Sequence, residues 1–406
     1  MKKFEIPLSY SASIIDSVRK IREKKDPRKR DMSPSVIKMK NVEFHIGRHF
    51  GFCYGVKNAI EICYTAIKNF PNKKIYLLSE MIHNQLVNQD LLENGISFIL
   101  DTSGNQLISW DKISENDIVI IPAFGTSLEV LEILKSKNIK TEKFDTTCPF
   151  VAKVWKRSKT IAEKGFTTII YGKADHEETK STFSRAKKHG PAIIVETIED
   201  VYDLCEIIQD SGSIKTKKFF KKKSLNFNFK KDLIKVGVVN QTTMLASETK
   251  DIIEIITNTL RKLHNKDDVS EYIANTKDTL CYATNENQQS TLNLLKNEVD
   301  LAIIVGGYNS SNTTHLAELT SQKVKTYFIN SPDKINLDNN IKHFDFHTKK
   351  EVTTKNFLPQ KKCKIILTSG ASCPDIIIEK IMRKISSIKK EKINLESILT
   401  DFEMNY

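Results

Sequence analysis

Short apolar runs alternate with longer amphipathic runs along most of the chain. The apolar runs are typical of buried strands and lie at 42–46, 74–78, 118–122, 167–171, 192–195, 234–239, 301–305, 326–330 and 364–368. The amphipathic runs are typical of helices and lie at 56–67, 85–92, 127–137, 149–163, from about 181, and at 287–297, 312–321 and 374–388. This alternation predicts an α/β fold in which mostly parallel sheets have helices on both faces.

The alternation repeats, which predicts three similar α/β units. The expected parts, in chain order, are a basic N-terminal extension at 1–40, units at 41–145, 146–278 and 279–390, and a C-terminal tail at 391–406. The extension contains a basic amphipathic stretch at 13–23, and the second unit carries a lysine-rich insert at 211–232. We expect residues 333–360 to form an irregular insertion.

Composition restricts the class of protein. The chain has 406 residues and is 39% hydrophobic, enough for two or three globular domains. No apolar run approaches the roughly 18 residues that a membrane helix needs, and no signal-peptide core follows Met1. The seven cysteines show no close pairing, so we expect a reducing cytoplasm and no disulfide framework.

The net charge of +13 is concentrated in two segments. Residues 1–30 carry +6 and residues 215–235 carry +8, so the rest of the chain is close to neutral. A solvated lysine-rich surface explains such segments, and so does a docking patch for an acidic partner. The distribution disfavours nucleic-acid binding as the main function, because the α/β body itself carries little charge.

Three cysteines lie in matching contexts, each where a polar turn meets a predicted helix. Cys53 and Cys148 precede the helical runs at 56–67 and 149–163, and Cys281 follows the polar run 275–279. Thiolates are the ligands of iron–sulfur clusters, and the N–H groups of a helix N-terminus stabilise them. Three ligands would leave one iron of a four-iron cluster open to substrate. The alternative is that each cysteine is a small buried residue.

Three of the other four cysteines lie in positions typical of packed core residues. Cys63 falls within a helical run, Cys205 in an apolar helical run and Cys363 beside a strand, whereas Cys373 lies in a polar loop and stays open. A zinc site would show close C-x-x-C spacing, which is absent.

Polar loops follow four of the predicted strands, at 80–84, 175–179, 309–312 and 369–375. Helix N-termini at the edge of an open α/β sheet bind anions, and hydroxyl, amide and imidazole donors there suit a diphosphate. Helix capping, or a structural role for a lone histidine, is the alternative at each position. No Gly-rich nucleotide loop is present, which disfavours an NAD or ATP site.

Glu178 is the candidate acid among these loops. A carboxyl near an anionic substrate would have a raised pKa and could deliver a proton. We expect Glu177 to face solvent instead, and the run Gln241-Thr242-Thr243 to place hydroxyl groups at the same sheet edge. Glu178 could also serve only the helix dipole, and Thr242 only a cap.

Taken together, these motifs resemble those of the 4-hydroxy-3-methylbut-2-enyl diphosphate reductases, the LytB/IspH family. The resemblance covers about residues 45–385, in the family's order. The matching runs are Gly51-Phe52-Cys53, Ile82-His83-Asn84, Asp145-Thr146-Thr147-Cys148-Pro149, His176-Glu177-Glu178, Gln241-Thr242-Thr243, Cys281-Tyr282-Ala283-Thr284, Asn309-Ser310-Ser311-Asn312 and Ser369-Gly370-Ala371-Ser372-Cys373-Pro374-Asp375.

The resemblance implies three α/β units around a central cavity that contains the cluster. It implies reductive removal of an allylic hydroxyl with two electrons and two protons, giving isopentenyl and dimethylallyl diphosphates. A [4Fe–4S] cluster would be held by Cys53, Cys148 and Cys281. Glu178 would supply the proton, with Thr242 and His176 also catalytic. The substrate would be bound by His83, His176, Thr242, Ser310, Ser311, Asn312 and Ser372.

Two positions depart from the family pattern. Members commonly have an Ala-His-Gly run where this chain has Ala123-Phe124-Gly125, and phenylalanine cannot donate a hydrogen bond to diphosphate. Glu177 follows His176 where proline is common. We expect a ferredoxin or flavodoxin as the electron donor, since both are acidic and the two appended segments are basic. The alternatives are another three-cysteine cluster enzyme, such as a hydro-lyase, and a basic nucleic-acid-binding protein.

Overall fold

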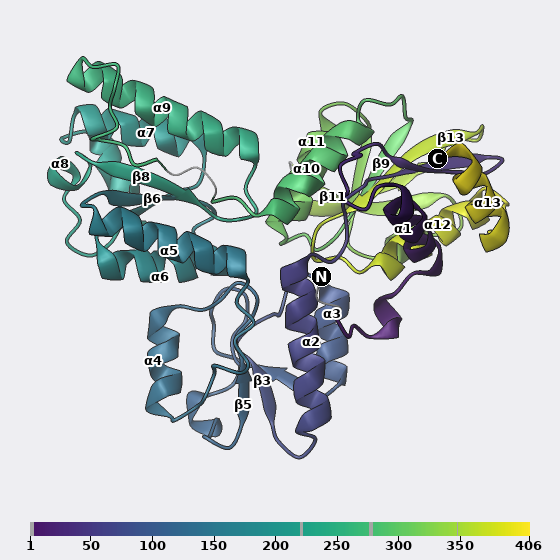
Figure 1. Ribbon diagram of the computed structural model, residues 1–406, viewed down its shortest axis with the longest axis horizontal. Helices are drawn as coiled ribbons and strands as arrows, with labels where there is room; N and C mark the ends of the chain where they lie inside the picture. The colour runs from purple at the N-terminus through teal and green to yellow at the C-terminus, as the bar shows by residue number, and fades with distance from the viewer. Residues whose placement is uncertain (1–3, 220–221, 276–278, 347) are drawn as a thin grey trace. The chain divides into compact units, whose positions relative to one another are not determined.

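The computed structural model describes residues 4–219, 222–275, 279–346 and 348–406, which form two compact units (Figure 1). Unit 1 comprises Met1–Lys57, Ile82–Asp90 and Tyr282–Tyr406, and unit 2 comprises Asn58–Met81 and Leu91–Cys281. The division falls inside two helices, α2 (Tyr54–Asn69) and α3 (Gln85–Glu93). The predicted α/β fold with mostly parallel sheets is confirmed.

A seven-stranded sheet forms the centre of unit 1, in the order β1-β2-β13-β9-β10-β11-β12. The four strands β2, β13, β9 and β10 run parallel, and β1, β11 and β12 add antiparallel edges. The strand bounds are β1 Ser35–Lys38, β2 Val42–Ile46, β9 Leu301–Val305, β10 Thr326–Ile329, β11 Asn340–Asp345, β12 Lys350–Lys355 and β13 Cys363–Ser369.

Helices cover both faces of this sheet, because alternate residues of its parallel strands belong to different apolar clusters. Ile303 and Ile365 pack with residues of α1, α12 and α13, whereas Ile304 and Ile366 pack with residues of α10 and α11. The helical bounds in unit 1 are η1 Leu8–Tyr10, α1 Ser13–Lys25, α10 Tyr282–Leu294, α11 Ser311–Ser321, η4 Pro332–Lys334, α12 Asp375–Ile388 and α13 Leu395–Asn405.

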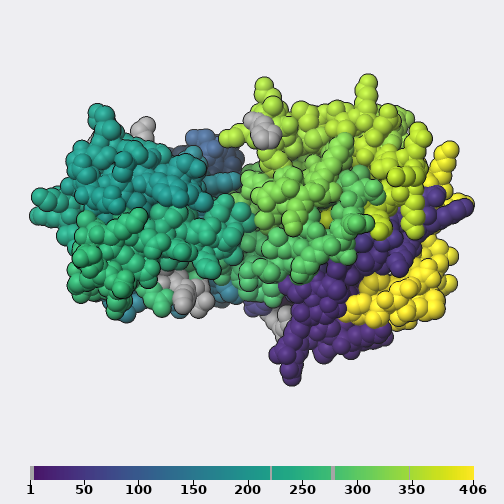
Figure 2. All heavy atoms as spheres, turned by 90° about the horizontal axis from the view of Figure 1, so that it is seen from above, coloured from purple at the N-terminus to yellow at the C-terminus, as the bar shows by residue number. Residues whose placement is uncertain are grey.

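The N-terminal segment is built into the core of unit 1. Ile14, Ile15 and Val18 of α1 are buried among residues of the central strands and α12. Arg22 is 1% exposed and donates to Asp31 Oδ2 at 2.7 Å. Helix α1 also packs against α13 at the end of the chain, and Figure 2 shows these two segments side by side, in purple and yellow.

Unit 2 contains two separate three-stranded parallel sheets, in the orders β4-β3-β5 and β7-β6-β8. Each strand residue of β3, β5, β6, β7 and β8 is buried, which explains their continuous apolar runs. The strand bounds are β3 Ile75–Leu77, β4 Ile96–Phe98, β5 Ile118–Ile120, β6 Thr167–Tyr171, β7 Ala192–Val195 and β8 Val236–Asn240. The helical bounds are η2 Trp110–Lys112, α4 Leu128–Ser136, α5 Pro149–Glu163, α6 Glu177–His189, α7 Ile198–Gln209, η3 Ile214–Phe219, α8 Phe229–Asp232 and α9 Ala246–His264.

The lysine-rich insert folds onto α7, and three of its lysines, Lys215, Lys218 and Lys222, form ion pairs with acids on or next to that helix. Lys218 pairs with Asp200 at 2.7 Å and with Asp203 at 2.8 Å, and Lys222 pairs with Glu196. Phe219 anchors the insert in the apolar cluster beneath. The described residues of the insert are therefore folded and pack on α7. Residues 220 and 221 lie outside the residues that the structure describes.

One predicted element is wrong. Residues 333–360 were expected to be irregular, but β11 and β12 pair antiparallel from Asn340↔Lys355 to Asp345↔Lys350. The hairpin lies at the sheet edge and buries few side chains, so it carries no strong apolar pattern.

The strands expected from the apolar runs are present, whereas helix α9 was not predicted. Residues 276–278, in the polar run before Cys281, lie outside the described residues. No described helix combines the length and hydrophobicity needed to cross a bilayer.

Truncating Ile15 to alanine should destabilise unit 1 by about 2–5 kcal/mol, because Ile15 is 2% exposed inside the main core. Leu8→Ala is the matched control, because Leu8 is 88% exposed and its removal should leave the free energy of unfolding nearly unchanged. Urea unfolding measures both. Equal, small effects would show that the N-terminal helix is not part of the core.

Candidate active site

Each of the three predicted ligand cysteines immediately precedes a helix. Cys53 comes before α2, Cys148 is the N-cap of α5 with Pro149 at its first turn, and Cys281 comes before α10. Burial raises the pKa of the Cys53 thiol, and the N–H groups of Val56 and Gly55 oppose this by favouring the thiolate. Helix N-termini supply such N–H groups to a sulfur ligand.

The backbone of each cysteine is tied to a loop that carries other predicted site residues. Cys53 N donates to Ala371 O at 3.1 Å, beside Ser372. Cys148 N donates to Ala123 O at 3.0 Å, beside Phe124, and Cys281 N donates to Thr242 O at 3.3 Å. The polar loops and the cysteine turns are thus joined pairwise within each unit.

The remaining four cysteines are core residues. Cys63, Cys205, Cys363 and Cys373 are 0%, 6%, 1% and 0% exposed, and burial raises the pKa of each thiol. The packing interpretation is confirmed for the first three. The burial of Cys373 shows that it too is a core residue, a point that its position in a polar loop had left open.

The cluster arrangement itself stays a prediction. Cys53 belongs to unit 1, whereas Cys148 and Cys281 belong to unit 2. Among the residues that the structure describes, no three histidine, cysteine, aspartate or glutamate side chains form a group that could hold a metal ion.

Glu178 and Thr242 form a buried pair in unit 2. Thr242 N donates to Glu178 Oε1 at 2.6 Å, and Thr242 Oγ1 lies 2.9 Å from Glu178 Oε2. Glu178 is 1% exposed. Burial raises the pKa of its carboxyl to about 7, although both hydrogen bonds from Thr242 act in the opposite direction. Glu178 can therefore hold and release a proton near neutral pH.

His176 caps the helix that carries Glu178. Its Nδ1 accepts a hydrogen bond from Glu178 N at 3.1 Å. A backbone N–H can only donate, so the neutral ring carries its proton on Nε2. Phe124 packs edge-on against this ring, with 5.4 Å between ring centroids. Phe124 therefore orients His176 by packing.

Glu177 is half-buried and more exposed than Glu178, in line with the sequence interpretation, but its carboxyl is not free in solvent. One oxygen bonds to Ser79 Oγ, and Oε2 is buried without a hydrogen-bond partner. Burial raises the pKa of the Glu177 carboxyl to about 8, to which Glu80 contributes through charge repulsion. Adjacent glutamates at the start of α6 are thus both protonatable, but only Glu178 bonds to Thr242.

The second group of predicted residues lies in unit 1, around His83. This histidine is 6% exposed, and its Nδ1 lies 3.1 Å from Asn309 Nδ2. With the amide donating, the imidazole proton is on Nε2. Ser372 Oγ donates to His83 O at 3.4 Å. Gly307 is required here, because a Cβ at that position would lie 2.3 Å from His83 O.

The N-terminus of α11 brings the other donors to the same region. Ser310 caps the helix through Thr313 N at 3.4 Å, and Ser311 and Asn312 form its first turn. Asn312 is 3% exposed, its Oδ1 accepts from Ala371 N, and its Nδ2 is buried without a hydrogen-bond partner. An unsatisfied buried donor at a helix N-terminus is suited to an anionic ligand.

Two residues near these groups were not predicted. Asn287 on α10 lies within 3.4 Å of Asn312 Oδ1 through its Nδ2, and Ser79 at the end of β3 bonds to Glu177. Asn287 follows Cys281 by less than two helical turns, and this spacing could have identified it from the sequence. Nothing in the sequence around Ser79 distinguishes it as a site residue.

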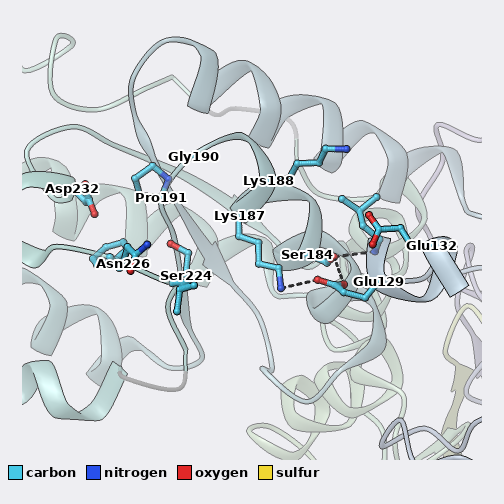
Figure 3. Close-up of a pocket in the computed structure, with 13 residues that line it drawn as sticks. Glu129, Glu132, Ser184, Lys187, Lys188, Gly190, Pro191, Ser224, Asn226 and Asp232 are labelled. Carbon is cyan, nitrogen blue, oxygen red and sulfur yellow. Dashed lines mark hydrogen bonds and ion pairs between the residues drawn. The ribbon is translucent and has the colours of Figure 1, made fainter.

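A separate cavity of about 640 Å³ lies in unit 2 between the insert, α4 and α6 (Figure 3). Glu129 pairs there with Lys187 at 2.8 Å and accepts from Ser184 Oγ at 2.7 Å. Burial opposes ionisation of Glu129, but these bonds lower its pKa to about 2. None of the predicted site residues lines this cavity.

Comparison with known proteins identifies the relatives of this chain. The family model described as "LytB protein" matches residues 45–386. A 4-hydroxy-3-methylbut-2-enyl diphosphate reductase from Crocosphaera subtropica is 38% identical over 349 residues, covering 85% of this chain and 84% of that protein. The protein of the same name from Gloeothece citriformis is 38% identical over 352 residues, covering 86% and 85%.

Several solved structures are similar, and two of them are compared with this chain. One, described as (E)-4-hydroxy-3-methyl-but-2-enyl diphosphate reductase, the terminal enzyme of the non-mevalonate pathway, is 26% identical with a TM-score of 0.52, covering 84% of this chain and 98% of that one. The reductase from Plasmodium falciparum has the same fold, with a TM-score of 0.61 at 24% identity, covering 91% and 99%. The resemblance found in the sequence is confirmed: the chain belongs to the LytB protein family.

Proposed function

We propose that this protein is a 4-hydroxy-3-methylbut-2-enyl diphosphate reductase that forms isopentenyl and dimethylallyl diphosphates. The reaction breaks the allylic C–O bond, consumes two electrons and two protons, and releases water. The observation that carries the proposal is the buried pair of Glu178 and Thr242, because removal of a hydroxyl as water requires a proton donor. Membership of the LytB family supports the same reaction.

Cys53, Cys148 and Cys281 would hold a [4Fe–4S] cluster. The donor set fits, because each of these thiols lies directly before a helix, whereas Cys63, Cys205 and Cys363 lie within a helix or a strand. When bound, such a cluster supplies electrons one at a time and a Lewis-acidic iron for the substrate hydroxyl. A cluster of this kind is consistent with a reducing cytoplasm.

The diphosphate would be bound by neutral donors. In unit 1 these are the Nε2–H group of His83, the unsatisfied Asn312 amide and the hydroxyl groups of Ser310, Ser311 and Ser372. In unit 2, His176 offers its Nε2–H group. Phe124 cannot add a donor, so His176 would act alone at that position, held by the packing of Phe124.

The hydrogen bonds of Glu178 support one direction of proton delivery. Glu178 Oε1 accepts from a backbone N–H group, so a protonated Glu178 would carry its proton on Oε2. It then points at Thr242 Oγ1, 2.9 Å away, and the threonine hydroxyl is free to donate to the substrate. Thr242 would thus pass the proton from Glu178 to the departing hydroxyl.

The electrons would come from a ferredoxin or flavodoxin type protein, because the allylic diphosphate substrate supplies none. Nothing in this reaction calls for nucleic acid or a membrane.

Glu178→Gln should lower kcat by about 10²–10⁴-fold with little change in substrate KM, because an amide cannot release the proton. Glu177→Gln is the matched control and should keep near-normal turnover, since Glu177 does not bond to Thr242. For the wild-type protein, kcat should fall as pH rises through about 7, when the Glu178 carboxyl loses its proton. Normal kcat in Glu178→Gln would place the proton elsewhere.

Thr242→Val should lower kcat by about 10–10²-fold, because the isosteric side chain removes the hydroxyl between Glu178 and the substrate. Thr242→Ser keeps the hydroxyl and should remain within a few fold of wild type. Steady-state kinetics on both variants tests the relay. Equal rates in the valine and serine variants would exclude it.

Cys148→Ser should lose the brown cluster absorbance and nearly all turnover while keeping its far-ultraviolet circular dichroism, because Cys148 caps α5 from a loop. Cys63→Ala removes a buried core thiol and should keep both colour and activity. Iron and sulfide analysis after anaerobic purification measures the difference. A fully loaded, active Cys148→Ser protein would reject the ligand assignment.

A further inference from the structure

The N-terminal segment builds one wall of a pocket around Cys53 in unit 1. The pocket has a volume of about 640 Å³. Residues of α1 and the segment after it face the turn that carries Cys53 and the start of α10. Figure 2 shows that the N-terminal residues, in purple, lie on the surface of the molecule.

The pocket is strongly cationic. Its lining includes six lysines or arginines, against the three acids Asp16, Glu23 and Glu286. Three of the cations are compensated: Arg19 pairs with Asp375, Lys29 with Glu23 and Arg48 with Asp26. The other three cations are Lys20, Arg28 and Lys57, for which no ion pair with another described residue is found.

The lysine-rich insert differs in this respect. Lys215, Lys218 and Lys222 all pair with acids on or next to α7. The uncompensated charge beside a predicted ligand cysteine therefore comes from the N-terminal segment and from Lys57, and the insert is not needed to explain it.

Aromatic side chains line the same pocket as the cations. Tyr54 and Tyr282, next to Cys53 and Cys281 in sequence, are 37% and 41% exposed. Phe4 packs edge-on against Tyr54 with 5.0 Å between ring centroids. An exposed aromatic centre within a charged rim is the usual composition of a protein-binding surface. A small anion would neutralise cations but would leave these rings exposed.

We propose that this surface, formed by Lys20, Arg28, Lys57, Tyr54 and Tyr282, docks an acidic one-electron carrier protein. The inference rests on the proposed function, because the reaction needs two electrons that neither the substrate nor the chain supplies. Two reduced carriers each give up one electron in turn and leave oxidised, while the C–O bond breaks and two protons are consumed. Cys53 in the pocket wall brings the proposed cluster close to the docked carrier.

Charge reversal on the full-length holoenzyme tests the proposal. Lys20→Glu/Arg28→Glu should raise KM for a reduced, acidic [2Fe–2S] ferredoxin at least about tenfold at low ionic strength, because rim charges control encounter. With reduced methyl viologen as the donor, the variant should turn over like wild type, since no protein needs to dock. Wild-type ferredoxin kinetics should weaken as salt increases.

The matched control is Lys230→Glu/Lys231→Glu, which makes the same change in net charge on exposed lysines of the insert. It should leave KM for ferredoxin within about twofold of wild type. Titration of oxidised ferredoxin, followed by NMR line broadening, gives Kd without turnover and should show the same order of variants.

The outcomes separate the two proposals. Unchanged KM and Kd in Lys20→Glu/Arg28→Glu, or equal losses in the two double variants, would overturn the docking surface while viologen-driven reduction continued. Absence of viologen-driven reduction in the wild-type holoenzyme would overturn the proposed function instead. Salt-sensitive binding of a nucleic-acid oligomer, with none of ferredoxin, would also overturn the docking proposal.

Discussion

The candidate site depends on the hydrogen bond that each proposed ligand cysteine makes through its backbone N–H. The acceptors are the carbonyl groups of Ala371, Ala123 and Thr242, which lie in or beside the loops proposed to contact substrate. Each bond fixes a thiol at a helix N-terminus and at the same time fixes the loop that carries donors or the acid. A parallel α/β architecture makes this possible, because its loops gather at the carboxyl ends of the strands. The same geometry then serves both the proposed cofactor and the proposed substrate.

Neutral donors and protonatable acids are the common feature of the site. His176 and His83 each have Nδ1 positioned to accept from a neighbour, so each would present an Nε2–H group. Phe124 keeps this arrangement for His176 by packing. Glu177 adds a second buried carboxyl, but its bond to Ser79 turns it away from Thr242. One glutamate of the pair thus belongs to the proposed relay and the other makes a structural contact, a distinction that burial alone would not make.

The sequence alone predicts those features whose pattern lies within one short segment of the chain. Continuous apolar runs identified the buried parallel strands, and cysteines at turn-to-helix junctions were separated from core cysteines such as Cys63 by their position in the pattern. Contacts distant in sequence could not be read in this way. Helix α1 looked like part of an appended extension because its partner Glu379, which accepts from Ile14 N at 2.8 Å, lies near the other end of the chain. The hairpin β11–β12 is mostly exposed and lacks an apolar pattern.

The net charge of a segment does not by itself distinguish a structural role from a binding role, because the distinction depends on the ion pairs that its charged side chains form. Two segments of similar formal charge behave differently, since acids on α7 pair with Lys215 and Lys218 of the insert, whereas Lys20 and Arg28 form no ion pair with another described residue. Formal charge measures what a segment contains, but long-range attraction depends on what its neighbours leave uncompensated. A segment can therefore be lysine-rich for stability of its own fold, or basic for an encounter with another molecule. The position of the uncompensated cations around Cys53 favours the second role for the N-terminal segment, and it is the basis of the proposed docking of an electron carrier.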